Sequence, residues 1–213
     1  MKRTQAARLP GVARHAHNPA VSPSGTRPMI QPLERPATYE DLCKIPDRFV
    51  AQIIHGQLIV QPRPAPKHAL ASSSLGEEVV GPFHKGRGGP GGWWILDEPE
   101  LHLGFDILVP DLVGWRRERL PALPDTAYFE TPPDWVCEVL SPSTAKMDRV
   151  DKLGIYASHG VAHAWLVDPD ARTLEAFQLE NGQWLRVAAL KDDDAVSVVP
   201  FDAISFKLGA LWA

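Results

Sequence analysis

The sequence predicts an α/β fold, and three stretches of the chain carry that prediction. Residues 135–140, WVCEVL, form an apolar, β-prone block between prolines, which is typical of a strand buried on both faces. Residues 163–190 contain three strand-like runs joined by a Pro-Asp turn and an Asn-Gly turn, which predicts a β-meander towards the C-terminus. Segments with helical spacing begin after Pro66 and after residue 143, so helices are expected to cover the strands.

The length and composition fit one globular domain. The chain has 213 residues, 44% of them hydrophobic and 23% charged, and no apolar run approaches the roughly 20 residues needed to span a bilayer. We therefore expect no membrane segment. The two cysteines lie far apart, Cys43 in an expected helix and Cys137 in the apolar strand, which favours buried thiols in a reducing compartment and hence a cytoplasmic location.

Charge divides the chain into a tail and a body. Residues 1–28 contain basic but no acidic side chains, so the remainder is more acidic than the net charge of −4 suggests. We expect a disordered basic tail over residues 1–35 and a folded domain over residues 36–213. An acidic body does not attract phosphate backbones by its overall field, so any nucleic-acid function needs a local basic groove or a metal ion.

The N-terminal half of this domain begins with local signals that are easy to place. Thr38 and Asp41 have the spacing of a helix cap, and residues 48–62 predict a hairpin that turns at His55 and Gly56, with Gln52 on its first strand. A helix is expected from Pro66, with His68 in its first turn. Residues 86–92, GRGGPGG, lack the Lys and Ser/Thr of a phosphate-binding P-loop and predict a flexible loop.

The second half places two carboxylates in buried strands. Residues 93–104 and 105–115 predict a strand pair, with Asp111 directly after Pro110 in an apolar run, and Glu138 interrupts the apolar block at 135–140. A lone ionised carboxylate in such a place costs several kcal/mol unless a partner or a metal offsets it. The next helix should run to about His159, and its spacing puts Lys152 near the Glu138 strand.

Two carboxylates on apolar strands and a lysine on the next helix are the parts of a metal-dependent phosphodiesterase. Hard oxygen ligands suit Mg²⁺ or Mn²⁺, so Asp111 and Glu138 are the expected metal ligands and Lys152 the residue that positions water or stabilises charge. Simpler interpretations stay open: Asp111 capping a strand end or a turn, Glu138 pairing with Arg149 or a surface arginine as a structural bridge, and Lys152 forming an exposed pair with Asp148.

Three segments together resemble the Uma-two family of bacterial restriction-endonuclease-like proteins, once known only as a domain of unknown function. They are AQIIHGQLIVQPRPAPKHA, LVPDLVGW and PPDWVCEVLSPSTAKMDRVDKLGIYASHGVAHAWLVDP, and the resemblance covers about residues 36–212. It implies the fold of the PD-(D/E)XK nuclease superfamily, a restriction-endonuclease-like mixed β-sheet flanked by helices. It also implies Mg²⁺-dependent hydrolysis of DNA.

The resemblance assigns roles to four residues. Asp111 matches the first metal-binding aspartate of the family and Glu138 the acidic residue of its second motif. Leu140 stands where that motif would carry its lysine, and Lys152 on the following helix matches the basic residue instead. Gln52 falls where the family has a glutamate; it brings no charge, so metal affinity should fall if that glutamate is a ligand.

Two functions from different classes follow. The first is a Mg²⁺- or Mn²⁺-dependent DNA endonuclease with Asp111, Glu138, Lys152 and Gln52 in its active site. The second is a catalytically impaired relative that acts as a DNA-binding or protein-interaction module, which the uncharged Gln52 and the acidic body favour. A homodimer is plausible for the first, because two active sites related by a two-fold axis cut both strands of a duplex most simply.

Overall fold

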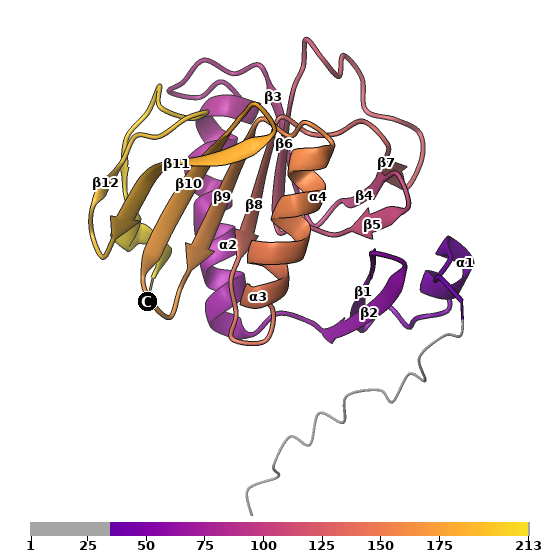
Figure 1. The fold of residues 1–213 in the computed structure, drawn as a ribbon. Helices are drawn as coiled ribbons and strands as arrows, with labels where there is room; N and C mark the ends of the chain where they lie inside the picture. The colour runs from indigo at the N-terminus through magenta and orange to yellow at the C-terminus, as the bar shows by residue number, and fades with distance from the viewer. Residues whose placement is uncertain (1–34, 213) are drawn as a thin grey trace, which may run out of the picture.

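The computed structural model describes residues 35–212, and it contains two main β-sheets with helices packed between and beside them (Figure 1). The basic tail expected over residues 1–35 lies, except for Arg35, outside the described residues. No helix in the described part of the chain is long and apolar enough to cross a membrane.

The larger sheet has six strands in the order β11-β10-β9-β8-β6-β3. β8 and β9 run parallel and all the other neighbours are antiparallel, so the sheet is mixed, as predicted. Its strands are β3 (Trp93–Asp97), β6 (Leu112–Arg116), β8 (Trp135–Val139), β9 (His163–Asp168), β10 (Thr173–Glu180) and β11 (Gln183–Lys191). The last three are the predicted meander.

The smaller sheet has five strands in the order β2-β1-β5-β4-β7 and lies beside the larger one. The predicted hairpin is confirmed as β1 and β2, and its turn residues His55 and Gly56 both adopt positive φ, 51° and 75°. The strands of this sheet are β1 (Phe49–Ile54), β2 (Gln57–Pro62), β4 (Glu100–Leu103), β5 (Asp106–Leu108) and β7 (Tyr128–Phe129).

The helical segments follow the predicted boundaries but contain π-helical turns. α1 (Tyr39–Leu42) begins after Thr38, whose backbone N–H donates to the Asp41 carboxylate. The remaining helical elements are α2 (Pro66–Val79), its π-helical extension Val80–His84, α3 (Ala145–Met147), a π turn over Asp148–Lys152, α4 (Leu153–Ser158) and a 3₁₀ turn over Leu208–Leu211. Two short strands, β12 (Ala195–Val196) and β13 (Phe206–Lys207), pair near the C-terminus.

Two predictions need correction. The strand pair expected over residues 93–115 is split between both sheets, since β3 pairs with β6 in the larger sheet and β4 pairs with β5 in the smaller one. The breaks fall at Glu98-Pro99 and at Val109-Pro110, where proline cannot continue a strand ladder and Glu98 adopts a φ of 44°. The thiol of Cys43 is exposed rather than buried, because Cys43 caps the end of the short helix α1.

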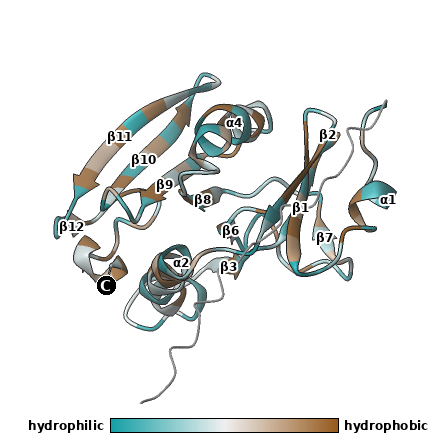
Figure 2. Ribbon diagram, turned by 90° about the horizontal axis from the view of Figure 1, so that it is seen from below, coloured by the Kyte–Doolittle hydropathy of each residue, from teal (hydrophilic) through white to brown (hydrophobic). Residues whose placement is uncertain are grey.

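β8 positions the site because it is covered on both faces. Figure 2 shows α2 on one side of the larger sheet and α4 on the other. Side chains of a strand alternate between its faces, and Trp135, Cys137 and Val139 pack into the core cluster that contains α2 residues. Val136 and Leu140 pack into the cluster that contains α4 residues. Glu138 lies two residues from each of them, so its side chain is on the same face of β8 and points towards the helix that carries Lys152.

Candidate active site

Glu138 is held by two donors from the helix that faces β8. Lys152 Nζ donates to Glu138 Oε2 at 2.9 Å, and the Tyr156 hydroxyl donates to Oε1 at 2.5 Å. Both partners are buried. The interpretation of Glu138 as a partner of Arg149 is therefore wrong, since Arg149 forms its ion pair with Glu175 at 2.5 Å on β10.

Lys152 lies at the end of the π turn and contacts two carboxylates at once. Besides Glu138, it approaches Asp148 Oδ1 at 3.3 Å, and the Lys152 side chain is only 4% exposed. Lys152 does pair with Asp148 at the i,i+4 spacing, but the interpretation of this pair as exposed is wrong. The pair is buried, and Lys152 also contacts Glu138. π turns inside helices are often found at functional sites.

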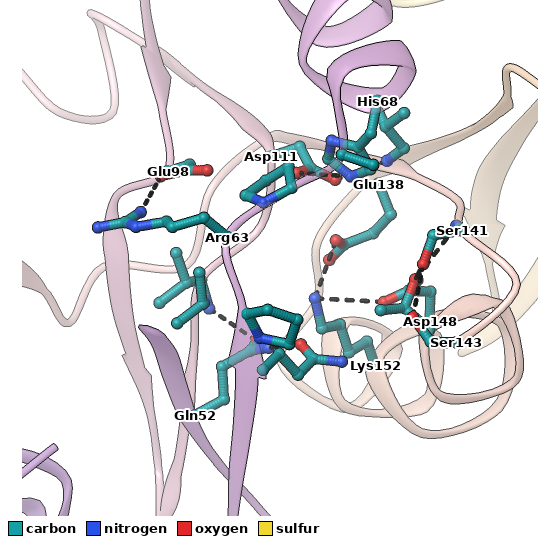
Figure 3. Close-up of a pocket in the computed structure, with 18 of the residues that line it drawn as sticks. Gln52, Arg63, His68, Glu98, Asp111, Glu138, Ser141, Ser143, Asp148 and Lys152 are labelled. Carbon is teal, nitrogen blue, oxygen red and sulfur yellow. Dashed lines mark hydrogen bonds and ion pairs between the residues drawn. The ribbon is translucent and has the colours of Figure 1, made fainter. Parts of the chain in front are cut away.

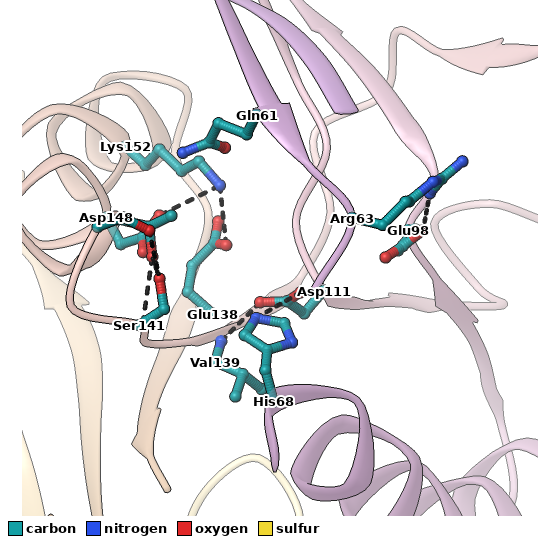
Figure 4. A network of polar contacts seen from close by, with 12 residues as sticks. Gln61, Arg63, His68, Glu98, Asp111, Glu138, Val139, Ser141, Asp148 and Lys152 are labelled. Atoms are coloured by element: carbon teal, nitrogen blue, oxygen red, sulfur yellow. Dashed lines mark hydrogen bonds and ion pairs between the residues drawn. The ribbon is translucent and has the colours of Figure 1, made fainter. Parts of the chain in front are cut away.

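Asp111 lies one residue before β6, the strand that pairs with β8, and its side chain is near Glu138 and Lys152. Leu112 pairs with Cys137 in the antiparallel register, so Asp111 is level with Glu138. The Val139 backbone N–H donates to Asp111 Oδ2 at 2.7 Å, and His68 Nε2 lies 3.2 Å from Oδ1 (Figure 4). Asp111 does cap a strand end, as one simpler interpretation had it, but its carboxylate also borders the pocket described next.

The predicted residues line one pocket of about 340 Å³ (Figure 3). Asp111, Glu138, Lys152 and Gln52 all contribute to its wall, together with His68 and Asp148 among others. They come from the strand ends of the larger sheet, from the π turn and from β1 of the smaller sheet. The sequence prediction that these side chains share one cleft agrees with this geometry.

Burial and like charges dominate the electrostatics of the pocket. Burial raises the pKa of Glu138 to about 8 against the opposing effect of Lys152, and burial also raises the pKa of Asp148. Burial alone would lower the pKa of Lys152 and of His68, but neighbouring carboxylates outweigh it and raise both. Glu138 and Asp148 thus share one ammonium, and both hold a proton more tightly than separated carboxyl groups would.

Gln52 has a fixed amide orientation. Its Oε1 accepts the Val109 backbone N–H at 2.9 Å, so this oxygen faces β5 and the loop after it, and Nε2 donates to Gln61 Oε1 at 3.4 Å. The carbonyl oxygen that could bind a metal therefore already has a donor. Gln52 is buried, and it contributes an uncharged amide where a carboxylate would add negative charge.

Three residues of the site were not singled out as site residues from the sequence. Asp148 and Tyr156 lie four residues on either side of Lys152, and that shared helical stripe was the available signal. His68 comes from α2, 43 residues before Asp111 in the sequence, and no local pattern links the two. Its position after Pro66, in the first turn of a helix, was the only hint.

The donor set fits a hard divalent cation. In residues 35–212 no three His, Cys, Asp or Glu side chains converge closely enough to form a complete metal site by themselves. Mg²⁺ usually keeps several waters and binds through one or two carboxylates, which matches an open pocket bordered by Asp111 and Glu138. Glu138 holds a proton below its pKa of about 8, so a cation bound at neutral pH would take the place of that proton.

Comparisons with known proteins place the chain in a family. The Uma2 family model, described as "Putative restriction endonuclease", matches residues 36–209. The crystal structure of a "putative nuclease belonging to DUF820" from Anabaena variabilis ATCC 29413 has a similar fold, with a TM-score of 0.66 and 23% identity, covering 83% of this chain and 97% of that one. No curated protein matches. Because the family model spans most of the chain, including the whole pocket, this protein belongs to the Uma2 family of restriction-endonuclease-like proteins.

Proposed function

We propose that this protein is a Mg²⁺- or Mn²⁺-dependent endonuclease that hydrolyses phosphodiester bonds of DNA. The observation that carries the proposal is the convergence of Asp111, Glu138 and Lys152 on one pocket from two strands and a helix. Membership of a family described as "Putative restriction endonuclease" supports nuclease function, and the shared fold agrees with it.

Asp111 and Glu138 are the residues that would hold the metal ion. When bound, such an ion supplies a Lewis acid for the phosphate oxygens and lowers the pKa of a coordinated water. Asp111 keeps its orientation through the Val139 N–H, and Glu138 keeps its orientation through Lys152 and Tyr156. Each carboxylate oxygen has a further lone pair beyond the one its donor uses, so these contacts leave acceptor capacity on both groups.

Lys152 supplies the positive charge of the proposed mechanism. It is buried and surrounded by carboxylates that keep it protonated, so it enters the reaction as an ammonium group. An ammonium group that is already held in place at the pocket wall stabilises the negative charge that develops on the phosphate, because no solvent has to reorganise around it. The same group can also orient the attacking water.

Gln52 is the residue on which the alternative depends. If its position requires a carboxylate, the chain is an impaired relative that binds DNA or protein without cutting. The amide of Gln52 adds no charge and its carbonyl oxygen already accepts a hydrogen bond from Val109. We propose that Asp111 and Glu138 suffice for one cation and that Gln52 shapes the pocket wall between β1 and β2.

The test is a Mn²⁺ titration on plasmid and single-stranded DNA. Wild-type protein should cut, and Glu138→Ala and Lys152→Ala should lose at least about a hundredfold in rate, as for the loss of a major electrostatic group. Glu175→Ala is the matched control, since Glu175 is also a strand carboxylate in an ion-pair network but lies outside the pocket.

Two outcomes decide between the candidates. Cleavage that survives in Glu138→Ala would place the activity in another site or another protein. Cleavage that is absent in wild type but appears in Gln52→Glu would support the impaired relative. We also propose that the active protein is a homodimer, whose two active sites would each cut one strand of a duplex. Sedimentation with and without DNA tests this, and a monomer that cuts both strands would contradict it.

A further inference from the structure

His68 contacts Asp111 from an element that carries no other proposed catalytic residue. It lies in the first turn of α2, two residues after Pro66, and its side chain is 13% exposed. Nε2 lies 3.2 Å from Asp111 Oδ1. The other ring nitrogen, Nδ1, is fully buried and has no hydrogen-bond partner among the described residues.

The contact fixes the state of the imidazole ring. A ring nitrogen that faces a carboxylate oxygen is favourable only when it carries a hydrogen, so Nε2 carries one in both the neutral and the charged ring. Nδ1 then remains buried without a partner, which lowers stability. Native proteins rarely keep such an atom unless the arrangement serves another purpose. Since Asp111 is the carboxylate that His68 contacts, we expect the arrangement to act on Asp111.

Asp111 is restrained at both oxygens by two different elements. The Val139 backbone N–H of β8 holds Oδ2 at 2.7 Å, and His68 of α2 restrains Oδ1. Figure 4 shows the Asp111 carboxylate in contact with both groups, and Asp111 also lines the pocket. One donor alone would leave the carboxylate free to rotate about its last torsion, which is a broad, soft torsion. The Val139 N–H and the His68 ring together select a single orientation.

We propose that His68 is a positioning residue that orients Asp111 for binding a divalent cation beside Glu138. This inference rests on the proposed function. His68 is not itself a ligand here, because the hydrogen on Nε2 occupies the position that would bind metal and Nδ1 is buried. Groups that orient a metal-binding carboxylate raise metal affinity by reducing the reorganisation that binding requires.

The chain contains a second half-buried His-carboxylate pair that serves as an internal control. His102 Nε2 lies 2.7 Å from Glu100 Oε1 on β4, and the His102 ring stacks on Tyr128 with centroids 3.9 Å apart. The His102 and Glu100 side chains are 17% and 22% exposed, close to the values for His68 and Asp111. His102 does not line the pocket. Both pairs join an imidazole to a carboxylate, at 2.7 Å for His102 and 3.2 Å for His68, and they differ in location.

The experiment is calorimetric titration of Mn²⁺ into the full chain and three variants. His68→Ala should weaken Mn²⁺ binding about tenfold or more, the usual cost of losing a group that orients a ligand. His68→Gln should keep most of the affinity, since its amide N–H can reach Asp111. His102→Ala should bind like wild type. Equal affinity in wild type and His68→Ala would overturn the inference, as would equal losses in the Ala and Gln variants.

A second measurement needs no variant to fold. In wild-type protein, titration with diamagnetic Mg²⁺ should shift the NMR signals of the His68 ring and leave those of His102 unchanged. Unchanged His68 signals in a protein that binds Mg²⁺ would overturn the inference alone. A wild-type chain that binds neither Mn²⁺ nor Mg²⁺ would overturn the proposed metal dependence and this inference together.

Discussion

The two ends of β8 each carry a buried carboxylate, and the two are held in opposite ways. Asp134, just before the strand, accepts the Arg116 backbone N–H at 2.8 Å and pairs with Arg119 at 2.7 Å. Glu138, near the other end, shares the single ammonium of Lys152 with Asp148. Arg119 is 45% exposed, so its charge is partly hydrated, whereas Lys152 is buried with its partners.

This difference separates a carboxylate that supports the fold from one that is available for chemistry. The Asp134 end is balanced, with one acid, one base and a backbone donor. The Glu138 end has more carboxylates than bases and therefore lowers the stability of the metal-free protein. Sites that are optimised for function commonly carry such a cost. Four predictions test the contrast.

The largest expected effect follows from removing the cation at each end. Lys152→Met should lower the free energy of unfolding by about 3–5 kcal/mol at pH 8, because it leaves buried carboxylates unpaired. Arg119→Met should cost only about 1 kcal/mol, since water can reach the Asp134 end. Urea unfolding measures both. Equal losses would remove the distinction between the two ends.

The next effect concerns pH. The folded-state pKa of Glu138 is raised from 4.5 to about 8, so the folded protein binds a proton that the unfolded chain releases. The free energy of unfolding should therefore fall as pH rises from about 5 to about 8, by at most about 1.4 kcal/mol per pH unit, and level off above that. Unfolding across this range should show the full slope in wild type and Asp134→Asn, and a smaller slope in Glu138→Gln, where only the raised pKa values of Asp148 and His68 still contribute.

Neutralising each carboxylate should change stability in opposite directions. At pH 8, Glu138→Gln should gain about 1 kcal/mol, because it removes a buried charge while Lys152 keeps Asp148 as partner. Asp134→Asn should lose about 1 kcal/mol, because it weakens a balanced pair. Thermal unfolding of both variants beside wild type gives the signs. A loss in Glu138→Gln would mean that this end also exists for stability.

The smallest expected effect comes from adding a negative charge near Glu138, at the end of β8 where carboxylates already outnumber basic groups. Gln52→Glu should tighten Mn²⁺ binding several-fold, roughly 1 kcal/mol or less, because one oxygen can still accept the Val109 N–H while the other adds an anionic ligand to the pocket. Gln178→Glu on β10, outside the pocket, is the control and should leave the affinity unchanged. Calorimetry that finds both variants equal would exclude Gln52 from the metal environment.

Local signals predicted much of this architecture from the sequence. The His55-Gly56 turn, the apolar block around Glu138 and the helix start at Pro66 each depend on neighbours in sequence, and each is present in the structure. The split of residues 93–115 was missed because both halves have strand character. Proline marks where a strand ends, but it does not say to which sheet each half belongs.

The prediction of the candidate site was limited by distance along the chain. Asp111, Glu138 and Lys152 could be singled out because charge in an apolar strand and helical spacing are visible in sequence. Their detailed partners were not visible: Val139 N–H for Asp111, Tyr156 for Glu138 and Val109 N–H for Gln52 depend on strand register and side-chain rotamers. Register across an antiparallel pair is a tertiary property that no single segment encodes.

The π turn at Asp148–Lys152 has a consequence for how this site can arise and disappear. A π turn holds one residue more than an α turn, and Val150 in its middle is exposed. Deleting that one residue would restore α-helical spacing and leave Asp148 and Lys152 three residues apart, still on one face of the helix. The two side chains could then remain partners. A substitution of Lys152, rather than a codon gained or lost, is therefore the shortest evolutionary step between a chain with this charged cluster and one without it.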